Sequence, residues 1–260
     1  MPVEIRLFYL GNMEKLVYNR YKGVITLYQI TSRVRFSEIG EDGYLTLHHL
    51  LNYFQDCSTF HLEDCGLGLN YFMSQNLAFY LLSWQIEINR LPVLGEYIRV
   101  GTMIYDCKGM FGYRNYVLYD EHDNILAYAN VSGCFLNPFT NEFVKLSQDE
   151  IAKYPIEEKL DMEYLPRKIK APKAKQQMEP IRINQFQIDM NGHVNNSQYV
   201  AIASEYLPPN VLVKQIRVEY KQAAKLGDIM IPTVAQQDSV YYVMLCNQEL
   251  KPYVIVAFRI

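Results

Sequence analysis

The sequence predicts an α+β protein made of two tandem copies of one unit, in which a helix is covered by an antiparallel sheet. Three observations lead to this fold class: an internal repeat, an apolar helical stripe in each copy, and strand-like segments after each stripe. The chain has 260 residues, enough for two units of about 100–150 residues each. Tyrosine occurs 22 times and phenylalanine 12 times, and both residues favour pleated sheets.

The helical part of the repeat links "EDGYLTLHHLLNYFQD" (41–56) with "MNGHVNNSQYVAIASE" (190–205). Gly43 matches Gly192, a shift of 192 − 43 = 149 positions, and in both copies a polar turn leads into a helical pattern. The spacing i, i+3, i+4, i+7 places the apolar residues of each pattern on one helix face. These residues are Leu47, Leu50, Leu51 and Phe54 in the first copy, and Tyr199, Ile202, Ala203 and Tyr206 in the second.

The strand part of the repeat links "QIEINRLPVLGEYI" (85–98) with "RVEYKQAAKLGDIM" (217–230), where Gly95 matches Gly227 at a shift of 227 − 95 = 132. The smaller shift leaves 149 − 132 = 17 extra residues in the first copy, in the segment 65–80. Polar and apolar residues alternate with period two along these segments, and further strand-like runs separated by short turns follow. A helix with one apolar stripe needs a sheet to cover it, and two such sheets placed edge to edge would remove exposed edges.

We divide the chain into an N-terminal unit (1–150), a linker (151–180) and a C-terminal unit (181–260). Prolines at 155, 166, 172 and 180 mark the linker. A run of five basic groups without an acid lies within it: Arg167, Lys168, Lys170, Lys173 and Lys175. Such a run either steers an acidic partner or forms the solvated face of the linker.

Composition excludes several classes of protein. A formal net charge of −3 argues against general nucleic-acid binding, which depends on a basic surface. The sequence contains no run of 18 apolar residues, so no membrane-spanning helix is expected. The start "MPVEIRLFYLGNMEKL" has acids among its apolar residues, unlike a signal peptide. The five cysteines are widely spaced and lack a C-x-x-C, so we expect reduced thiols in the cytoplasm.

The segment "DMNGHVNNSQY" (189–199) places small polar groups just ahead of the second helical pattern. Asp189, Asn191 and His193 stand at alternate positions, and Gly192 would let backbone approach a ligand closely. A structural reading is open too, because these residues are suited to an Asx turn and the following asparagines to a helix cap. The first copy has Gly40, Asp42 and Tyr44 at the equivalent positions, so the local fold does not require the polar trio.

The same segment resembles the Asp-x-Asn-x-His-Val-Asn-Asn signature of acyl-acyl carrier protein thioesterases, bacterial relatives of the plant plastid enzymes. The first copy is also similar to the N-terminal half of that family, in "DGYLTLHHLLNYFQDCSTFHLEDCGLGL", "WQIEINRLPVLGEYIRVGT" and "YRNYVLYDEHDNILAYA". The resemblance runs in order over most of the chain. It implies a double hotdog fold and hydrolysis of the thioester that joins a fatty acyl chain to acyl carrier protein.

The resemblance places the acid, amide and imidazole of the family on Asp189, Asn191 and His193. The family's further glutamate falls on Ala223, and the cysteine that follows it in the plant enzymes falls on Ala224. We therefore expect Asp189 or His193 to act in place of that glutamate, or activity to be low. Cys134 stands where relatives often have tryptophan, which we interpret as packing.

Thioester hydrolysis needs an activated water, donors for the oxyanion and a proton for the leaving thiol. Asp189 is the best candidate to activate water as a base, or to attack as a nucleophile through an anhydride. Asn191 could donate to the carbonyl or hold the water, and His193 could protonate the thiolate. Backbone N–H groups near the helix start, at Val194 and Asn195, are candidate oxyanion donors. The first unit, which lacks the acid and the imidazole, would mainly bind the acyl chain.

Other histidines and cysteines have a simpler explanation. His48, His49 and His61 lack an i, i+4 pair, so we expect a solvated helix face and no metal. Cys57 and Cys65 have no partnering motif for a nucleophile and are expected to pack.

We thus expect a cytoplasmic thioester hydrolase of lipid metabolism that releases free fatty acid from acyl carrier protein without a cofactor. The basic residues of the linker are the candidate docking site for the acidic carrier protein. Two alternatives stay open: an acyl-CoA thioesterase of the hotdog fold, and a non-catalytic acyl-binding double hotdog protein. The repeat could make a monomer sufficient, although a homodimer is also compatible with the sequence.

Overall fold

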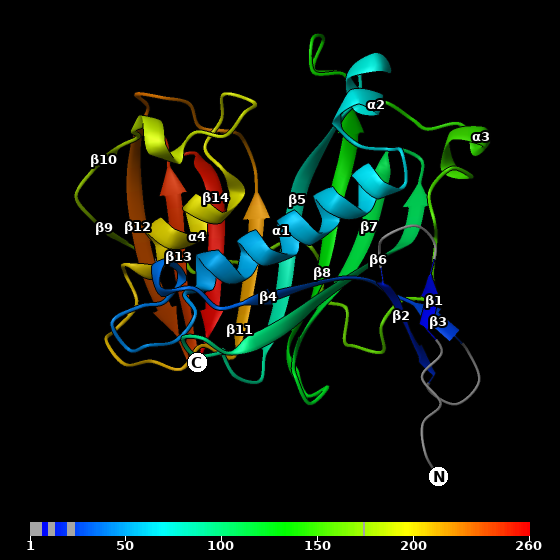
Figure 1. Cartoon of the computed structure of the whole chain (residues 1–260). Helices are drawn as coiled ribbons and strands as arrows, with labels where there is room; N and C mark the ends of the chain where they lie inside the picture. Colours follow the sequence, from blue (N-terminus) through cyan, green and yellow to red (C-terminus); the bar gives the residue numbers. More distant parts are fainter. Residues whose placement is uncertain (1–6, 10–13, 20–23, 174) are drawn as a thin grey trace.

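The computed structural model describes residues 7–9, 14–19, 24–173 and 175–260, so the N-terminal stretch tested above for a signal peptide lies partly outside it. Its main feature is a single antiparallel sheet in the order β10-β12-β13-β14-β11-β5-β8-β7-β6-β4, with β9 paired to β12 (Figure 1). The strands from the first unit are β4 (Tyr28–Arg33), β5 (Ala78–Ile88), β6 (Tyr97–Lys108), β7 (Phe111–Asp120) and β8 (Ile125–Leu136). Those after them are β9 (Gln176–Gln177), β10 (Ile181–Arg182), β11 (Gln215–Tyr220), β12 (Ile229–Gln237), β13 (Val240–Cys246) and β14 (Pro252–Arg259).

The remaining elements are helices and a small separate sheet. The α-helices are α1 (Leu47–Asp64), α2 (Leu69–Ser74), α3 (Gln148–Ile151) and α4 (Asn196–Ser204), and the 3-10 helices are η1 (Phe36–Glu38) and η2 (Gln185–Gln187). Strands β1 (Leu7–Tyr9), β2 (Glu14–Asn19) and β3 (Val24–Thr26) pair with one another. Helices α1 and α4 lie across one face of the main sheet (Figure 1).

The two halves of the main sheet have the same topology. Outward from the centre, the first runs β5-β8-β7-β6-β4 and the second β11-β14-β13-β12-β10. They meet where β5 pairs with β11, for example Ile86 with Ile216, so the two sheets join edge to edge as the repeat predicted. The predicted fold class, an α+β double hotdog, is confirmed.

The repeat extends to individual backbone hydrogen bonds. The N–H of Gly40 donates to the carbonyl of Tyr44 at 2.9 Å, and that of Asp189 to the carbonyl of His193 at 2.8 Å. One residue further on, Leu45 donates to Pro92 at 2.8 Å, just as Val194 donates to Ala224 at 2.9 Å. The turn before each helix is therefore one structure used twice, with different side chains.

The two helices differ in length. Helix α1 buries Leu50, Leu51 and Phe54 against the sheet, and Phe54 stacks on Trp84 with ring centroids 6.0 Å apart. Helix α4 ends at Ser204, so the prediction that Tyr206 continues its helical face is wrong. Two prolines follow closely, at 208 and 209, and a proline disfavours the α conformation in the residue that precedes it.

The linker crosses the sheet on the face opposite the helices, where buried polar side chains hold it. Asn115, fully buried, accepts through Oδ1 from the N–H of Leu160 and from the hydroxyl of Tyr164. Glu219 accepts from the N–H of Ile169 at 2.9 Å. Ile169 is buried, whereas the five basic residues around it are exposed, so their charges face solvent.

One histidine does not fit the expected solvated face. His61 is only 7% exposed, and its Nδ1 lies 2.9 Å from Nη1 of Arg114 on β7. Burial lowers the pKa of Arg114. His61 follows the buried Phe54 by seven residues and the buried Cys57 by four, so it lies on the same inward face of α1.

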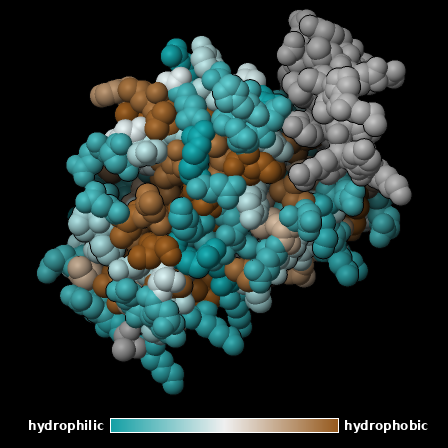
Figure 2. All heavy atoms as spheres, turned by 90° about the horizontal axis from the view of Figure 1, so that it is seen from below, coloured by the Kyte–Doolittle hydropathy of each residue, from teal (hydrophilic) through white to brown (hydrophobic). Residues whose placement is uncertain are grey.

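The surface combines polar and apolar side chains. Seen from below, brown apolar groups appear in patches among teal polar ones, as on most folded proteins (Figure 2). No helix in the described part of the chain is long and apolar enough to cross a membrane.

Candidate active site

A cavity of about 240 Å³ lies where the two units meet. Strand β11 pairs with β5 only from Ser83 to Glu87, so residues 78–82 of β5 continue beyond its end. The turn 189–194 and the segment 220–223 flank this opening, and the cavity contains residues from both units. Its lining residues are Phe79, Tyr80, Leu81, Leu82, Cys134, Leu136, Phe143, Asp189, Asn191, His193, Val194, Asn196, Tyr199, Tyr220, Lys221, Gln222 and Ala223.

The predicted trio of Asp189, Asn191 and His193 is brought together at this cavity. Oδ1 of Asp189 accepts from the N–H of Asn191 at 2.8 Å and from that of His193 at 3.4 Å. Gly192 has φ +74°, a left-handed conformation that glycine adopts without strain. The carboxylate therefore forms the expected Asx turn with one oxygen, while Oδ2 accepts no hydrogen bond from the described residues. The role of Asp189 in shaping the turn is therefore compatible with its predicted role in activating water.

The start of helix α4 supports a cap but not the expected backbone oxyanion donors. Asn195 caps the helix, since its Oδ1 accepts from the N–H and the hydroxyl of Ser197. The N–H groups of Val194 and Asn195 donate to Ala224 and Gln187, both at 2.9 Å. Both N–H groups hold the repeated turn in shape, so neither is free for a ligand, contrary to the sequence prediction.

Three tyrosines complete the site and were not predicted as site residues. The hydroxyl of Tyr199 accepts from the N–H of Ala224 at 2.8 Å, and that of Tyr220 donates to the carbonyl of Asn196 at 3.0 Å. Burial raises the pKa of Tyr199 to about 12, so its hydroxyl keeps its proton. The ring of Tyr80 meets that of His193 edge-on, with centroids 6.3 Å apart.

The repeat contained a signal for two of these tyrosines. Tyr199 and Tyr220 correspond to Leu50 and Ile88 of the first copy. An apolar core position that becomes tyrosine in only one copy indicates a hydroxyl with a local task.

The titratable groups of the cavity are few. Among its described lining residues, Asp189 carries the only carboxylate and His193 the only imidazole. Ala223 does line the cavity, so the glutamate position of the family is at the site but has no acid. Lys221 lines it as well and pairs with Glu219.

Cys134 and Cys57 are unsuited to nucleophilic attack, whereas Cys65 is exposed and so does not pack as expected. Cys134 lines the cavity, and burial raises the pKa of its thiol. Burial raises the pKa of Cys57 to about 12, and this residue lies on the buried face of α1. Thiols held in their protonated form react poorly, which agrees with the packing expected for Cys57 and Cys134.

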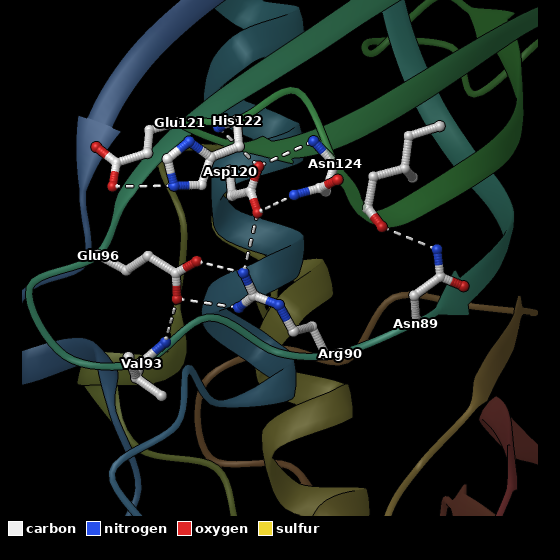
Figure 3. A network of polar contacts seen from close by, with 9 residues as sticks. Asn89, Arg90, Val93, Glu96, Asp120, Glu121, His122 and Asn124 are labelled. Atoms are coloured by element: carbon white, nitrogen blue, oxygen red, sulfur yellow. Dashed lines mark hydrogen bonds and ion pairs between the residues drawn. The ribbon is translucent and has the colours of Figure 1, made fainter.

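At the equivalent place in the first unit lies a network of ion pairs. Arg90, the counterpart of Gln222, contacts Glu96 at 2.6 Å and Asp120 at 3.2 Å, and Glu96 also accepts from the N–H of Val93 (Figure 3). Asp120 in turn accepts from the N–H groups of His122 and Asn124. This network joins the β5–β6 and β7–β8 turns, so the first copy uses the place for structure.

Two helix-in-sheet units, with a carboxylate, an amide and an imidazole in a cavity between them, define a double hotdog protein with a polar site where its units meet. Comparison with known families agrees with this class. The family model for the acyl-ACP thioesterase N-terminal domain matches residues 26–154, and that for the C-terminal domain matches residues 170–250. The chain belongs to the acyl-ACP thioesterase family.

Plant enzymes are among its relatives. An acyl-[acyl-carrier-protein] hydrolase of Cuphea viscosissima (FATB3, chloroplastic) is 26% identical over 226 residues, covering 79% of this chain and 54% of the relative. Oleoyl-acyl carrier protein thioesterase 1 of Arabidopsis thaliana is 22% identical over 221 residues, covering 76% of this chain and 60% of the relative. The chain thus spans little more than half the length of these relatives.

Solved bacterial structures have the same fold. An acyl-ACP thioesterase from Bacteroides thetaiotaomicron superposes with a TM-score of 0.82 at 20% identity, over 90% of this chain and 97% of the other. A putative oleoyl thioesterase from Lactobacillus plantarum gives a TM-score of 0.81 at 21% identity, over 90% and 96%.

The network around Arg90 predicts a pH-dependent contribution to stability. The hydrogen bond from Arg90 lowers the pKa of Glu96. A carboxylate whose pKa is lowered by folding stabilises the protein above its unfolded pKa of about 4.3, and this contribution is lost as pH falls through the folded pKa. We expect Glu96→Gln to reduce the free energy of unfolding by about 1 kcal/mol or less at neutral pH, since the Arg90–Glu96 pair is partly solvated. In acid, where Glu96 is protonated, the reduction should disappear.

Urea unfolding at a series of pH values measures this difference. The control is Glu41→Gln, which changes an exposed glutamate outside the network. A Glu96→Gln effect that stays constant down to strongly acidic pH would contradict the assignment.

Proposed function

We propose that the protein hydrolyses the thioester between a fatty acyl chain and acyl carrier protein, and so releases free fatty acid. The observation that carries this proposal is the cavity between the units, where the only carboxylate among the described lining residues stands beside an amide, an imidazole and an apolar surface. The apolar part comes from the first unit, through Phe79, Leu81 and Leu82 of β5. The polar groups come from the second.

The roles follow from the contacts. Asp189 takes a proton from water through Oδ2, while its Oδ1 stays fixed by backbone N–H groups. The water oxygen bonds to the carbonyl carbon, and the C–S bond then breaks. His193 gives the leaving thiolate a proton. The alternative, in which Asp189 attacks the carbonyl and forms an anhydride, uses the same carboxylate.

The oxyanion needs donors other than Val194 and Asn195. The N–H of Asn196, at the first position of α4, has no acceptor among the described residues, and Asn196 lines the cavity. Together with the amide of Asn191, it would present two donors to the developing negative charge at a helix start.

The carrier protein would dock on the face that the linker crosses. Arg167, Lys168, Lys170, Lys173 and Lys175 are exposed there. A second cavity, of about 350 Å³, is lined by Lys168 and Lys170 together with Arg217 and Arg259 from the sheet, and by no acid. A positive surface of this kind favours an acidic partner and speeds its encounter. We propose action in the cytoplasm, as a monomer whose two units already form the paired sheet.

Ala223 favours one other function. A site that lacks the family glutamate is also what a non-catalytic acyl-binding protein would have. An acyl-CoA thioesterase on the same fold is the third candidate. Kinetics with carrier-bound and CoA-bound substrates separate these possibilities.

Replacement of Asp189 by asparagine tests the catalytic assignment. The variant should lose at least about a hundredfold in kcat/KM, which is the low end for a general base. Its thermal unfolding should stay close to wild type, because the amide oxygen can still accept from the N–H of Asn191. The first copy offers a matched control in Asp42→Asn, since Oδ1 of Asp42 accepts from the N–H of Tyr44 at 3.0 Å. Equal activity of both variants would remove Asp189 from the mechanism.

Charge reversal tests the docking surface. The triple variant with Arg167, Lys168 and Lys170 changed to glutamate should have a higher KM for acyl carrier protein substrates and an unchanged KM for a small acyl-CoA. The matched control reverses three exposed lysines elsewhere: Lys108, Lys145 and Lys251. The docking surface is misassigned if both substrates are affected alike, or if the control triple has the same effect.

A further inference from the structure

Phe79 lines the cavity on the side of the first unit. Among the described residues that line the cavity, it alone also packs against a separate buried cluster, which we name the α2 cluster. The buried members of the α2 cluster are Leu67, Leu77, Ile104, Cys107, Phe135, Leu146 and Tyr154. The ring of Phe79 therefore stands between the open space and a second apolar region.

The sheet is shaped to seat this ring. Gly133 on β8 and Gly112 on β7 are directly paired, and a Cβ on either would lie only 2.2 Å or 2.9 Å from ring carbons of Phe79. Any side chain at Gly133 would displace the ring. Phe79 also packs on Phe135, with ring centroids 5.0 Å apart. The ring position thus depends on two neighbouring residues without side chains.

The region behind the ring is aromatic, and it contains a buried hydroxyl group without a hydrogen-bond partner among the described residues. Phe135 contacts Phe72 of α2 and Tyr154, with ring centroids 6.4 Å and 6.0 Å apart. Tyr154 is 6% exposed, and its hydroxyl has no hydrogen-bond partner among the described residues. Helix α2, at the upper end of β5 and β8 in Figure 1, lies in the 17-residue excess of the first copy. The second unit has no counterpart of this layer.

Because the cavity is small, the position of Phe79 affects how long an acyl chain can be bound. The volume of about 240 Å³ is below the range of about 300–1,000 Å³ that is usual for ligand pockets. The thioester carbonyl and its neighbours occupy part of that space, so an acyl chain that enters toward the first unit soon meets the ring. A longer chain fits only if the ring is absent or displaced toward the α2 cluster.

We propose that Phe79 sets the upper limit of acyl chain length, and that the space next to the α2 cluster takes the methyl end of a longer chain once the ring is removed. This inference rests on the proposed function, and it assigns the substrate class to chains short enough to end at the ring. Phe79 acts through its volume and takes no part in bond making.

The experiment measures kcat/KM for a series of saturated acyl carrier protein substrates of increasing chain length. Phe79→Ala should shift the preference to longer chains, by about fourfold for each additional methylene that the new space buries. Phe79→Leu removes less volume, so it is the second variant in case Phe79→Ala does not fold. It should give a smaller shift in the same direction. The control is Phe139→Ala, which removes a phenylalanine that is 82% exposed and does not line the cavity. It should keep the wild-type profile.

A second readout separates this inference from the proposed function. Calorimetric titration with free fatty acids of the same chain lengths needs no turnover, and both Phe79 variants should bind longer acids than wild type. Folded variants with the wild-type profile in turnover and in binding overturn the role of Phe79 while the hydrolase assignment stands. A wild type that hydrolyses no substrate, beside variants that bind longer acids, overturns the hydrolase assignment and supports the role of Phe79.

Discussion

The antiparallel pairing of β5 with β11 is the constraint on which the rest of the structure depends. It joins two sheets of equal topology into one and removes the inner edge of each. Because β11 ends at Tyr220 while β5 starts as early as Ala78, the pairing is incomplete at one end. The cavity lies at this opening, and for that reason it takes most of its apolar residues from the first unit and its charged and amide groups from the second.

Duplication supplies the same backbone turn twice and gives it two tasks. In both copies the turn before the helix is held by the same hydrogen bonds, so its shape does not depend on which side chains it carries. In the second copy, Asp189 and His193 replace Gly40 and Tyr44. In the first copy, the neighbouring turn is tied by Arg90, Glu96 and Asp120. Under the proposed function, the second half supplies the chemistry, while in the first half the equivalent region is tied by ion pairs.

Sequence reasoning predicted the features that repeat and missed those that depend on strand pairing. Two matched glycine pairs and the helical stripes were enough for the fold class, because each records a local requirement for a turn or a buried face. Phe79 and Tyr80 became site residues only because β5 outruns its neighbour, which no spacing along the chain records. Arg217 and Arg259 extend the basic linker from distant strands for the same reason. The N–H groups of Val194 and Asn195 are not free to bind an oxyanion, because both donate to backbone carbonyls that hold the repeated turn.

We propose that Asp189 activates water in a site where Ala223 stands at the position of the family glutamate. Steady-state kinetics of wild type beside Ala223→Glu, with an acyl carrier protein substrate, are the sharpest test of this role. Clear wild-type turnover is expected, with a change of less than about tenfold when the glutamate is restored, because a competent base is already present. A wild type at the uncatalysed rate, together with a gain of about a hundredfold or more in Ala223→Glu, would contradict it.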